Sequence, residues 1–296
     1  MRRAYPHFLH DIVVRAGLPP RTAHFRDRGH DRPFPQGQDR ADRRWRQKPG
    51  RTDRPRLRQP GRQAIVIHYN SAATQADAEA TVAAVQAAGS KAVALQGDLT
   101  SAAAMERLFA DAVAAVGRPD IAINTVGKVL KKPLLEISEA EYDEMSAVNA
   151  KAAFFFLKEA GRHVNDGGRI CTLVTSLLGA FTPFYSSYAG TKAPVEHFTR
   201  AASKEFGERG ISVTAIGPGP MDTPFFYPAE SADAQAYHKT AAALSAFTRT
   251  GLTDIADIVP WIRFLVTDGW WMTGQTILVN GGYTTNNAAT HGVALQ

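Results

Sequence analysis

Two residues of the chain are spaced so that they could exchange a proton with a small molecule. Tyr188 and Lys192 are four positions apart, so on a helix their side chains lie on one face. A free phenol has a pKa of about 10, and a neighbouring ammonium group favours its phenolate form. Such a pair could act as an acid or a base, although the same spacing also occurs in a solvated tyrosine beside a surface lysine.

Two further polar residues precede this pair and strengthen the case for chemistry. Ser176 stands twelve residues before Tyr188, in Val-Thr-Ser-Leu-Leu-Gly, where a predicted strand ends. Asn149 lies in Ala-Val-Asn-Ala-Lys on a long predicted helix. Taken alone, each is as compatible with a structural role as with catalysis, whereas the four residues together favour an active site.

Strand-like and helix-like segments alternate from Ala64 onward. The predicted strands are Ala64–Tyr69, Ala92–Leu95, Asp120–Asn124, Arg169–Thr175, Ile211–Ile216 and Thr276–Val279. The predicted helices are Gln75–Ala88, Ala102–Val116, Glu139–His163, Tyr188–Phe206 and Ile255–Val266. This alternation is typical of an α/β fold, with a parallel sheet covered by helices on both faces. We expect one catalytic domain over residues 64–283 and a tail over residues 284–296.

Residues 1–63 have a different composition and no strand or helix periodicity, so we expect an irregular Arg/Pro-rich segment. They contain 16 Arg and 1 Lys against 6 Asp and no Glu, a balance of +11 in a chain of net charge +6. A disordered basic tail and a targeting sequence are possible interpretations. We favour a third, out-of-frame translation of GC-rich DNA. Codons 40–55 can read, in another frame, as a strand, a glycine-rich turn and the start of a helix.

Composition also argues against several classes of protein. No apolar run is long enough for a membrane helix. Cys171 is the only cysteine, so we expect no disulfide framework, no metal site and a cytoplasmic location. Residues 64–296 carry a net charge of −5, and this negative charge disfavours nucleic-acid binding by the folded domain.

From about Ala64 to Tyr283 the chain resembles the short-chain dehydrogenase/reductase family. Ser176, Tyr188 and Lys192 match its Ser…Tyr-x-x-x-Lys arrangement, and Asn149 matches its helix asparagine. The other matching segments are Asp98 in Gly-Asp-Leu-Thr, Asn124-Thr-Val-Gly127 in place of Asn-Asn-Ala-Gly, Pro218–Thr223, and Gly274–Gly282. The resemblance implies a Rossmann-type doubly wound sheet. The main departure is the first βα unit, whose glycine-rich loop does not precede Ala64, so that this unit is missing or replaced.

The resemblance implies an NAD(P)-dependent oxidoreductase that interconverts a carbonyl and an alcohol. Tyr188 would be the general acid in reduction and the general base in oxidation. Lys192 would lower the pKa of that phenol and bind the nicotinamide ribose. Ser176 would polarise the carbonyl oxygen, and Asn149 would hold a water that relays protons. The alternatives are a catalytically impaired binding or regulatory protein of this fold, and a nucleic-acid binder that uses the Arg-rich end.

The resemblance also implies a set of cofactor contacts. They are Asn70, Ser71, Asp98, Leu99, Asn124, Gly127, Tyr188, Lys192, Pro218, Gly219, Met221 and Thr223. An acidic residue after the second strand of such folds binds the ribose 2′-hydroxyl, and its absence leaves room for a 2′-phosphate. Tyr69-Asn70-Ser71 contains no acid. We therefore favour NADP(H) over NAD(H).

Aromatic residues cluster where the resembling family has its substrate pocket. They are Phe181, Phe184 and Tyr185 before Tyr188, and Phe225, Phe226 and Tyr227 after Thr223. They favour an apolar or aromatic carbonyl compound, as a small-molecule substrate, although each could equally pack at a subunit interface. The sequence also resembles 3-oxoacyl-thioester reductases. Members of the family are usually tetramers or dimers, so we expect a homo-oligomer, packed through the helices that start near Glu139 and Tyr188.

Overall fold

The computed structural model describes residues 12–16, 63–180 and 182–285, and seven strands within these ranges form one sheet. The strands are β1 (Ile12–Ala16), β2 (Ala64–Tyr69), β3 (Lys91–Gln96), β4 (Ile121–Asn124), β5 (Arg169–Leu173), β6 (Ser212–Pro218) and β7 (Thr276–Val279). Their order across the sheet is β3-β2-β1-β4-β5-β6-β7. All neighbouring pairs are parallel except the two that β1 forms.

An interior strand of the sheet, β1, corrects the expectation that residues 1–63 hold no regular element. It lies between β2 and β4 and pairs antiparallel with both. Strand backbones need hydrogen-bond partners, and Ile-Val-Val-Arg-Ala combines β-branched residues with no proline. Ile12 is opposite Asn124, at the carboxyl end of β4, whereas Ala16 is opposite Ala64, at the start of β2. The rest of the Arg-rich segment lies outside the described residues.

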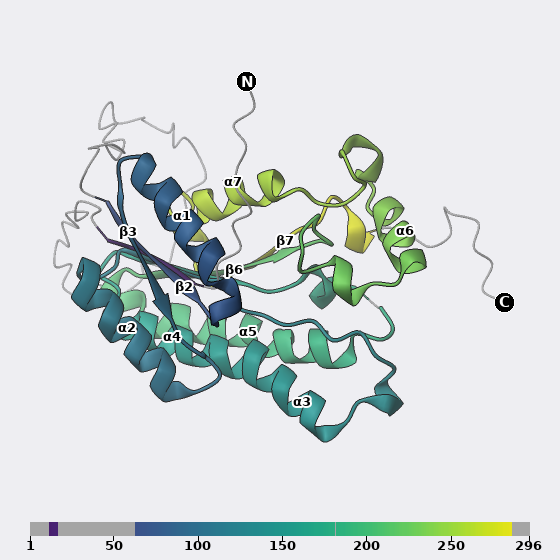
Figure 1. Cartoon of the computed structure of the whole chain (residues 1–296), viewed down its shortest axis with the longest axis horizontal. Coiled ribbons are helices and arrows are strands. Elements are labelled where there is room, and N and C mark those ends of the chain that lie inside the picture. The colour runs from purple at the N-terminus through teal and green to yellow at the C-terminus, as the bar shows by residue number, and fades with distance from the viewer. Residues whose placement is uncertain (1–11, 17–62, 181, 286–296) are drawn as a thin grey trace, which may run out of the picture.

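Helices cover both faces of the sheet (Figure 1). The helices are α1 (Gln75–Ala87), α2 (Ala102–Val116), α3 (Glu139–Met145), α4 (Ala152–His163), α5 (Ser186–Glu205), α6 (Ala232–Ala241) and α7 (Ile255–Leu265). In Figure 1, α2, α4 and α5 lie on one face, and α1 and α7 lie on the other. None of the helices in the described ranges is long and apolar enough to span a bilayer.

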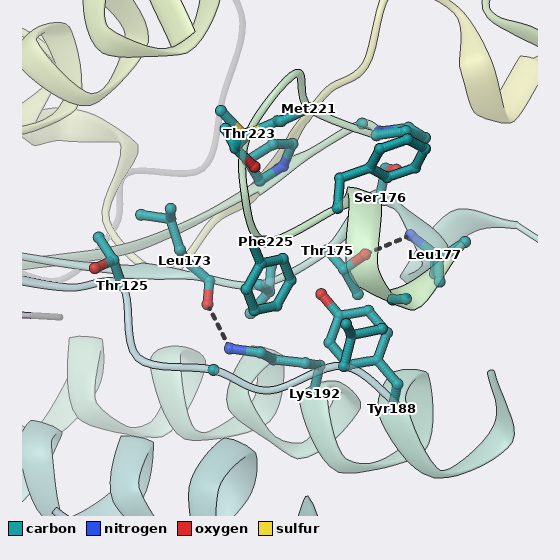
Figure 2. Close-up of a pocket in the computed structure, with 18 of the residues that line it drawn as sticks. Thr125, Leu173, Thr175, Ser176, Leu177, Tyr188, Lys192, Met221, Thr223 and Phe225 are labelled. Atoms are coloured by element: carbon teal, nitrogen blue, oxygen red, sulfur yellow. Dashed lines mark hydrogen bonds between the residues drawn. The ribbon is translucent and has the colours of Figure 1, made fainter. Parts of the chain in front are cut away.

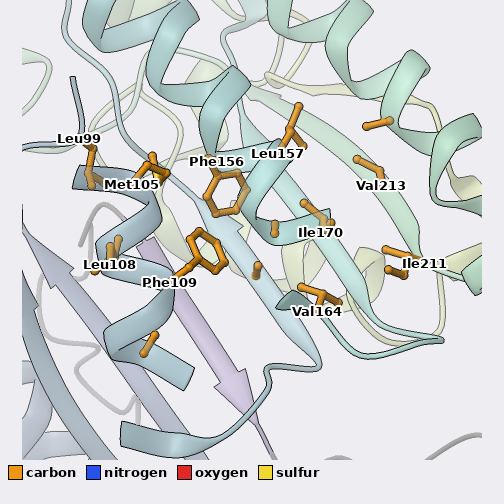
Figure 3. Packing of buried hydrophobic residues seen from close by; sticks show 14 of the residues in the cluster. Leu99, Met105, Leu108, Phe109, Phe156, Leu157, Val164, Ile170, Ile211 and Val213 are labelled. Carbon is orange, nitrogen blue, oxygen red and sulfur yellow. The ribbon is translucent and has the colours of Figure 1, made fainter. Parts of the chain in front are cut away.

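The core follows from strands that are apolar on both faces, as in a parallel sheet covered on both sides. In β5, Ile170 packs with Phe109 of α2 and Phe156 of α4, as Figure 3 shows. The next residue, Cys171, belongs to a second cluster that includes Ile258 of α7. Successive side chains of a strand point to opposite faces, so each covering layer is fixed to the sheet by its own row of residues.

The long helix predicted over Glu139–His163 is interrupted. It begins with a capping box between Ser138 and Glu141, and a π-helical stretch, Ser146–Lys151, separates α3 from α4. Such π-helical turns are rare and often occur at functional sites. Here the turn contains Asn149, which is completely buried.

Candidate active site

A cavity of about 590 Å³ opens where β4, β5 and β6 end (Figure 2). Residues that directly follow these three strands line it, among them Thr125, Val174 and Gly219. Crevices at the carboxyl ends of parallel strands are the usual ligand sites of open α/β sheets. The cavity is therefore the candidate active site.

The helix α5 brings Tyr188 and Lys192 to one side of this cavity, as their spacing predicts. Figure 2 shows the phenol oxygen and the ammonium group directed toward the same space, beside the ring of Phe225. Lys192 Nζ donates hydrogen bonds to the main-chain oxygens of Val126, at 2.9 Å, and Leu173, at 3.2 Å. The lysine is thus anchored to the ends of β4 and β5 while it remains on the cavity wall.

Burial governs the acidity of Tyr188, which is only 8% exposed. It raises the pKa of the phenol above its ordinary value, because the charged phenolate would lose solvation. A hydrogen bond with the Thr175 hydroxyl lowers this pKa in part. The expected effect of Lys192 on this pKa stays a prediction. Tyr188 is protonated at neutral pH, which is the form that a proton donor needs.

Two adjacent hydroxyl residues, Thr175 and Ser176, border the cavity after β5. Both are buried. Thr175 caps a short 3-10 helix, Ser176–Gly179, and its Oγ1 accepts a hydrogen bond from Leu177 N at 3.2 Å. Ser176 was predicted from the sequence and Thr175 was not, although the pair Thr-Ser at the end of a strand was the available signal.

The side chain of Asn149 links two parts of the cavity wall, the loop after β4 and the helix α5. Its Oδ1 accepts from Lys128 N at 3.0 Å. Its Nδ2 donates to Lys128 O at 2.9 Å and to Thr191 Oγ1 at 3.1 Å. The side chain thus positions the wall next to Lys192. The expected role of Asn149 in holding a relay water stays a prediction.

Gly127 allows a close approach in the same wall. A Cβ atom at this position would lie 2.9 Å from Lys192 Nζ and 3.3 Å from Asn149 Oδ1. Both distances are shorter than ordinary van der Waals contact. The glycine therefore lets the backbone pass directly over the lysine, at a point where a ligand could also meet it.

The predicted cofactor contacts divide into two groups. Those that line the cavity are Gly127, Tyr188, Lys192, Pro218, Gly219, Met221 and Thr223. Those outside its lining are Asn70, Ser71, Asp98, Leu99 and Asn124. In the second group, Asn70 and Asp98 are exposed, Leu99 is a core residue, and Asn124 Oδ1 accepts from Val126 N at 2.9 Å. The structure thus brings seven of the expected contacts together in the cavity lining and places the other five outside it. The seven lie with Tyr188 at what would be the nicotinamide end of the site, and we call the region of Asn70 and Asp98 the adenosine side.

The predicted aromatic cluster is also split. Tyr185, Phe225 and Phe226 line the cavity, whereas Phe184 and Tyr227 do not. Phe181 lies outside the described residues. Glu230 and His238, which no sequence pattern had selected, complete this part of the lining. They lie more than forty residues beyond Tyr188, so only the tertiary fold brings them to the site.

The chemistry of the cavity suits the nicotinamide end of a dinucleotide. Gly127 leaves backbone accessible beside Lys192, whose ammonium can donate to a ribose hydroxyl, and Gly219 leaves it accessible elsewhere in the lining. The described ranges contain no group of three His, Cys, Asp or Glu side chains that could hold a metal ion.

Comparison with known proteins agrees with this geometry. The family described as Enoyl-(Acyl carrier protein) reductase matches residues 57–284. A Hydroxynaphthalene reductase-like protein Arp2 from Metarhizium brunneum is 34% identical over 75% of this chain and 86% of its own length.

Two solved structures extend the comparison. One is the crystal structure of a dehydrogenase from Burkholderia cenocepacia with bound NADP. Its sequence is 76% identical to this chain, and the match has a TM-score of 0.74 and covers 75% of this chain and 84% of the dehydrogenase. A blue fluorescent protein from a metagenomic library, in complex with NADPH, is 28% identical, with a TM-score of 0.68, over 74% and 86% of the two chains.

Proposed function

This chain belongs to the short-chain dehydrogenase/reductase family and is an NAD(P)-dependent oxidoreductase, and we propose that it interconverts a carbonyl and an alcohol with Tyr188 as the proton donor and acceptor. The observation that carries this proposal is the shared cavity wall of Tyr188, Lys192 and the Thr175–Ser176 pair. A catalytically impaired binding protein of the same fold would not need a buried phenol, an ammonium group and two hydroxyls around one space.

Each polar residue has a separate part in the proposed reduction. NADPH, when bound, supplies the hydride. Ser176 donates a hydrogen bond to the carbonyl oxygen, where negative charge develops. Tyr188 delivers the proton to that oxygen, and Thr175 stabilises the phenolate that forms. Lys192, held by Val126 O and Leu173 O, binds the ribose and keeps a positive charge near the phenolate.

NADP(H) is the proposed cofactor in preference to NAD(H). The turn after β2, Tyr69-Asn70-Ser71, has no carboxylate that would repel a 2′-phosphate. The similar structures from Burkholderia cenocepacia and from the metagenomic library contain NADP and NADPH.

The proposed substrate is an apolar or aromatic carbonyl compound. Leu177, Phe225 and Phe226 give the cavity a largely apolar lining. One relative is named as hydroxynaphthalene reductase-like, which agrees with a ring-shaped substrate.

Isotope transfer tests the proposal with model ketones in place of the natural substrate. The protein is incubated with NADPH that carries deuterium at the transferred position, and with a panel of aromatic and aliphatic ketones. We expect one deuterium at the carbinol carbon of at least one product, and less product with labelled NADH. A panel that yields no deuterated alcohol would count against the proposed reaction, and equal yields with both cofactors would count against the NADP(H) preference.

We also propose a homo-oligomer, in the cytoplasm, that packs through α4 and α5. Phe154 of α4 is 48% exposed and contacts Phe198 of α5, so an apolar patch crosses the two helices. Light scattering of the wild type and of Phe154→Glu tests this. A monomeric wild type would contradict the proposal.

For residues 1–63 we propose out-of-frame translation of a segment that encodes the first βα unit. The Arg-rich composition and the antiparallel direction of β1 in an otherwise parallel sheet support this. The coding DNA decides it. A stop codon or a glycine-free reading over codons 40–55 in both alternative frames would overturn it.

A further inference from the structure

A cluster of polar side chains, all buried except the partly exposed Lys131, lies next to Tyr188 and takes no part in the proposed proton transfer. Its members come from five separate segments, and they are Lys131, Tyr185, Glu230, His238 and Tyr283. The side chain of Glu230 is only 3% exposed, and that of His238 is 6% exposed. Burying so many polar groups is costly unless each has a partner, so the cluster needs an explanation.

Glu230 is the centre of this cluster. Its Oε2 accepts a hydrogen bond from Lys131 Nζ at 2.6 Å, and its Oε1 accepts one from the Tyr185 hydroxyl. The Lys131 ammonium group therefore balances the charge of the buried carboxylate. A carboxylate can accept about four hydrogen bonds, so two bonds leave it with further capacity.

The other members direct their protons toward Glu230 as well. Burial lowers the pKa of His238, so the imidazole is neutral at pH 7. Since Tyr185 uses its proton on Glu230, we assign the His238 proton to Nε2, which lies 3.4 Å from the Tyr185 oxygen. His238 Nδ1 then accepts from the Tyr283 hydroxyl at 3.2 Å. The hydrogen bonds from Tyr283 through His238 and Tyr185 to Glu230 thus all donate in one direction, and the last acceptor is the carboxylate.

Three members of the cluster, Tyr185, Glu230 and His238, line the same cavity as Tyr188. The ring of Tyr185 lies 6.5 Å from that of Tyr188, measured between centroids. Around them the lining is apolar, with Val129, Leu177, Phe225, Phe226 and Ala229. The carboxylate is therefore an acceptor of hydrogen bonds in an apolar wall of the cavity that Tyr188 also lines.

We propose that Glu230, held by Lys131 and Tyr185, binds a hydroxyl group of the substrate, so that the enzyme selects carbonyl compounds that carry a hydroxyl remote from the reacting carbonyl. This inference rests on the proposed function, because it uses the same cavity. A neutral hydroxyl fits better than an ammonium group, since Lys131 already neutralises the carboxylate and would repel a second cation.

Binding to the full chain tests the inference without requiring turnover. Calorimetry gives the Kd of 1-tetralone and of its 5-, 6- and 7-hydroxy derivatives, with the matching methoxy compounds as controls for size. We expect at least one hydroxy isomer to bind about tenfold more tightly than 1-tetralone, as a hydrogen bond to a charged group allows, and its methoxy counterpart to lose that advantage.

Variants then locate the group responsible. The quantity compared is the Kd of 1-tetralone divided by the Kd of its tightest-binding hydroxy isomer. In Glu230→Gln this ratio should fall below about threefold. In Glu144→Gln, which removes a surface carboxylate paired with Lys128, the ratio should not change. In Tyr185→Phe the ratio should persist or increase, because Glu230 remains and no longer accepts a hydrogen bond from the Tyr185 hydroxyl. This last variant decides the question if Glu230→Gln does not fold.

Each outcome has a definite meaning. Equal binding of all hydroxy isomers and 1-tetralone, or a ratio that survives in Glu230→Gln, would overturn the assignment of Glu230. Loss of the ratio in Tyr185→Phe would transfer the contact to Tyr185 and also overturn it. A measured hydroxyl preference without deuterium transfer to any ketone would instead contradict the proposed reaction, so the two failures are distinguishable.

Discussion

The two ends of the predicted dinucleotide site differ in how firmly the chain holds them. On the nicotinamide side, Tyr188, Lys192 and Asn149 are buried, and Lys192 and Asn149 bind main-chain atoms of the loop after β4 and of Leu173, the last residue of β5. On the adenosine side, Asn70 and Asp98 are exposed and lie outside the cavity lining. Hydrogen bonds to the main chain thus hold the residues of the nicotinamide side in place around one cavity, whereas the residues of the adenosine side do not share a cavity with them.

The direction of β1 explains much of this difference. In a dinucleotide-binding fold the turn after the first strand lies at the carboxyl edge of the sheet, where the next helix begins and binds the pyrophosphate. Here Ile12, the first residue of β1, lies at that edge beside Asn124, and the strand ends at the opposite edge beside Ala64. The proposed catalytic groups are held by β4, β5 and α5, so their arrangement does not depend on the strand between β2 and β4.

The largest effect that would sharpen this comparison concerns cofactor affinity. We expect the chain as given to bind NADPH at least about a hundredfold more weakly than a form in which codons 40–55 are read in the alternative frame. This factor corresponds to about 2.7 kcal/mol, the loss expected when a helix N-terminus no longer binds the pyrophosphate. Titration of both forms by calorimetry measures it. Comparable affinities would show that residues 1–63 do build a phosphate site.

The next effect lies within the nicotinamide side. Ser176→Ala should lower kcat by about a hundredfold, because a hydrogen-bond donor to the developing oxyanion is lost. Thr175→Val should lower it only severalfold, but it should raise the pKa of Tyr188, since the present hydrogen bond lowers that pKa. The rate of alcohol oxidation, which needs phenolate, should then rise at a higher pH than in the wild type. If Thr175→Val is the more damaging change and leaves the pH profile unmoved, the two hydroxyls have exchanged roles.

The smallest effect concerns the core between the two ends. Burial raises the pKa of the Cys171 thiol to about 12 from an ordinary 9. The unfolded chain therefore loses this proton at a lower pH than the folded chain, so stability present below pH 9 falls as the pH rises from 9 toward 12. In Cys171→Ala, Tm should decline less between pH 8.5 and about 10.5 than in the wild type. An identical decline in both proteins would show that the thiol does not contribute to it.

The elements that hold Tyr188 and Lys192 could be predicted because their signals are local. The four-residue spacing of Tyr188 and Lys192 is a property of one helix, and α2 and β7 have the predicted bounds. The predicted strand over Arg169–Thr175 ends earlier, at Leu173, because Thr175 instead caps a short helix. An interruption such as Ser146–Lys151 leaves the helical periodicity nearly intact, so the pattern of apolar residues did not reveal it.

The unpredicted features depend on residues that are distant in sequence. Ile12–Ala16 becomes a strand only because β2 and β4 both offer unpaired edges to it. Glu230, which precedes α6, and His238, within α6, have no distinctive local pattern, and only the tertiary fold brings them to Tyr185. Tertiary contacts of this kind are invisible to local patterns, which is why the sequence predicted Tyr188 and Lys192 in the cavity but not Glu230 and His238.

Tyr188 is the proposed proton donor at the firmly held end of the site, and one variant tests this role directly. Tyr188→Phe is compared with the wild type in the form with the restored reading frame, by single-turnover reduction of a ketone at saturating NADPH and by calorimetric titration of NADPH. We predict that kcat falls at least about a hundredfold, because the variant lacks the hydroxyl group that delivers the proton, while the Kd for NADPH changes less than about twofold. A Tyr188→Phe enzyme that keeps more than about a tenth of the wild-type kcat would contradict the assignment.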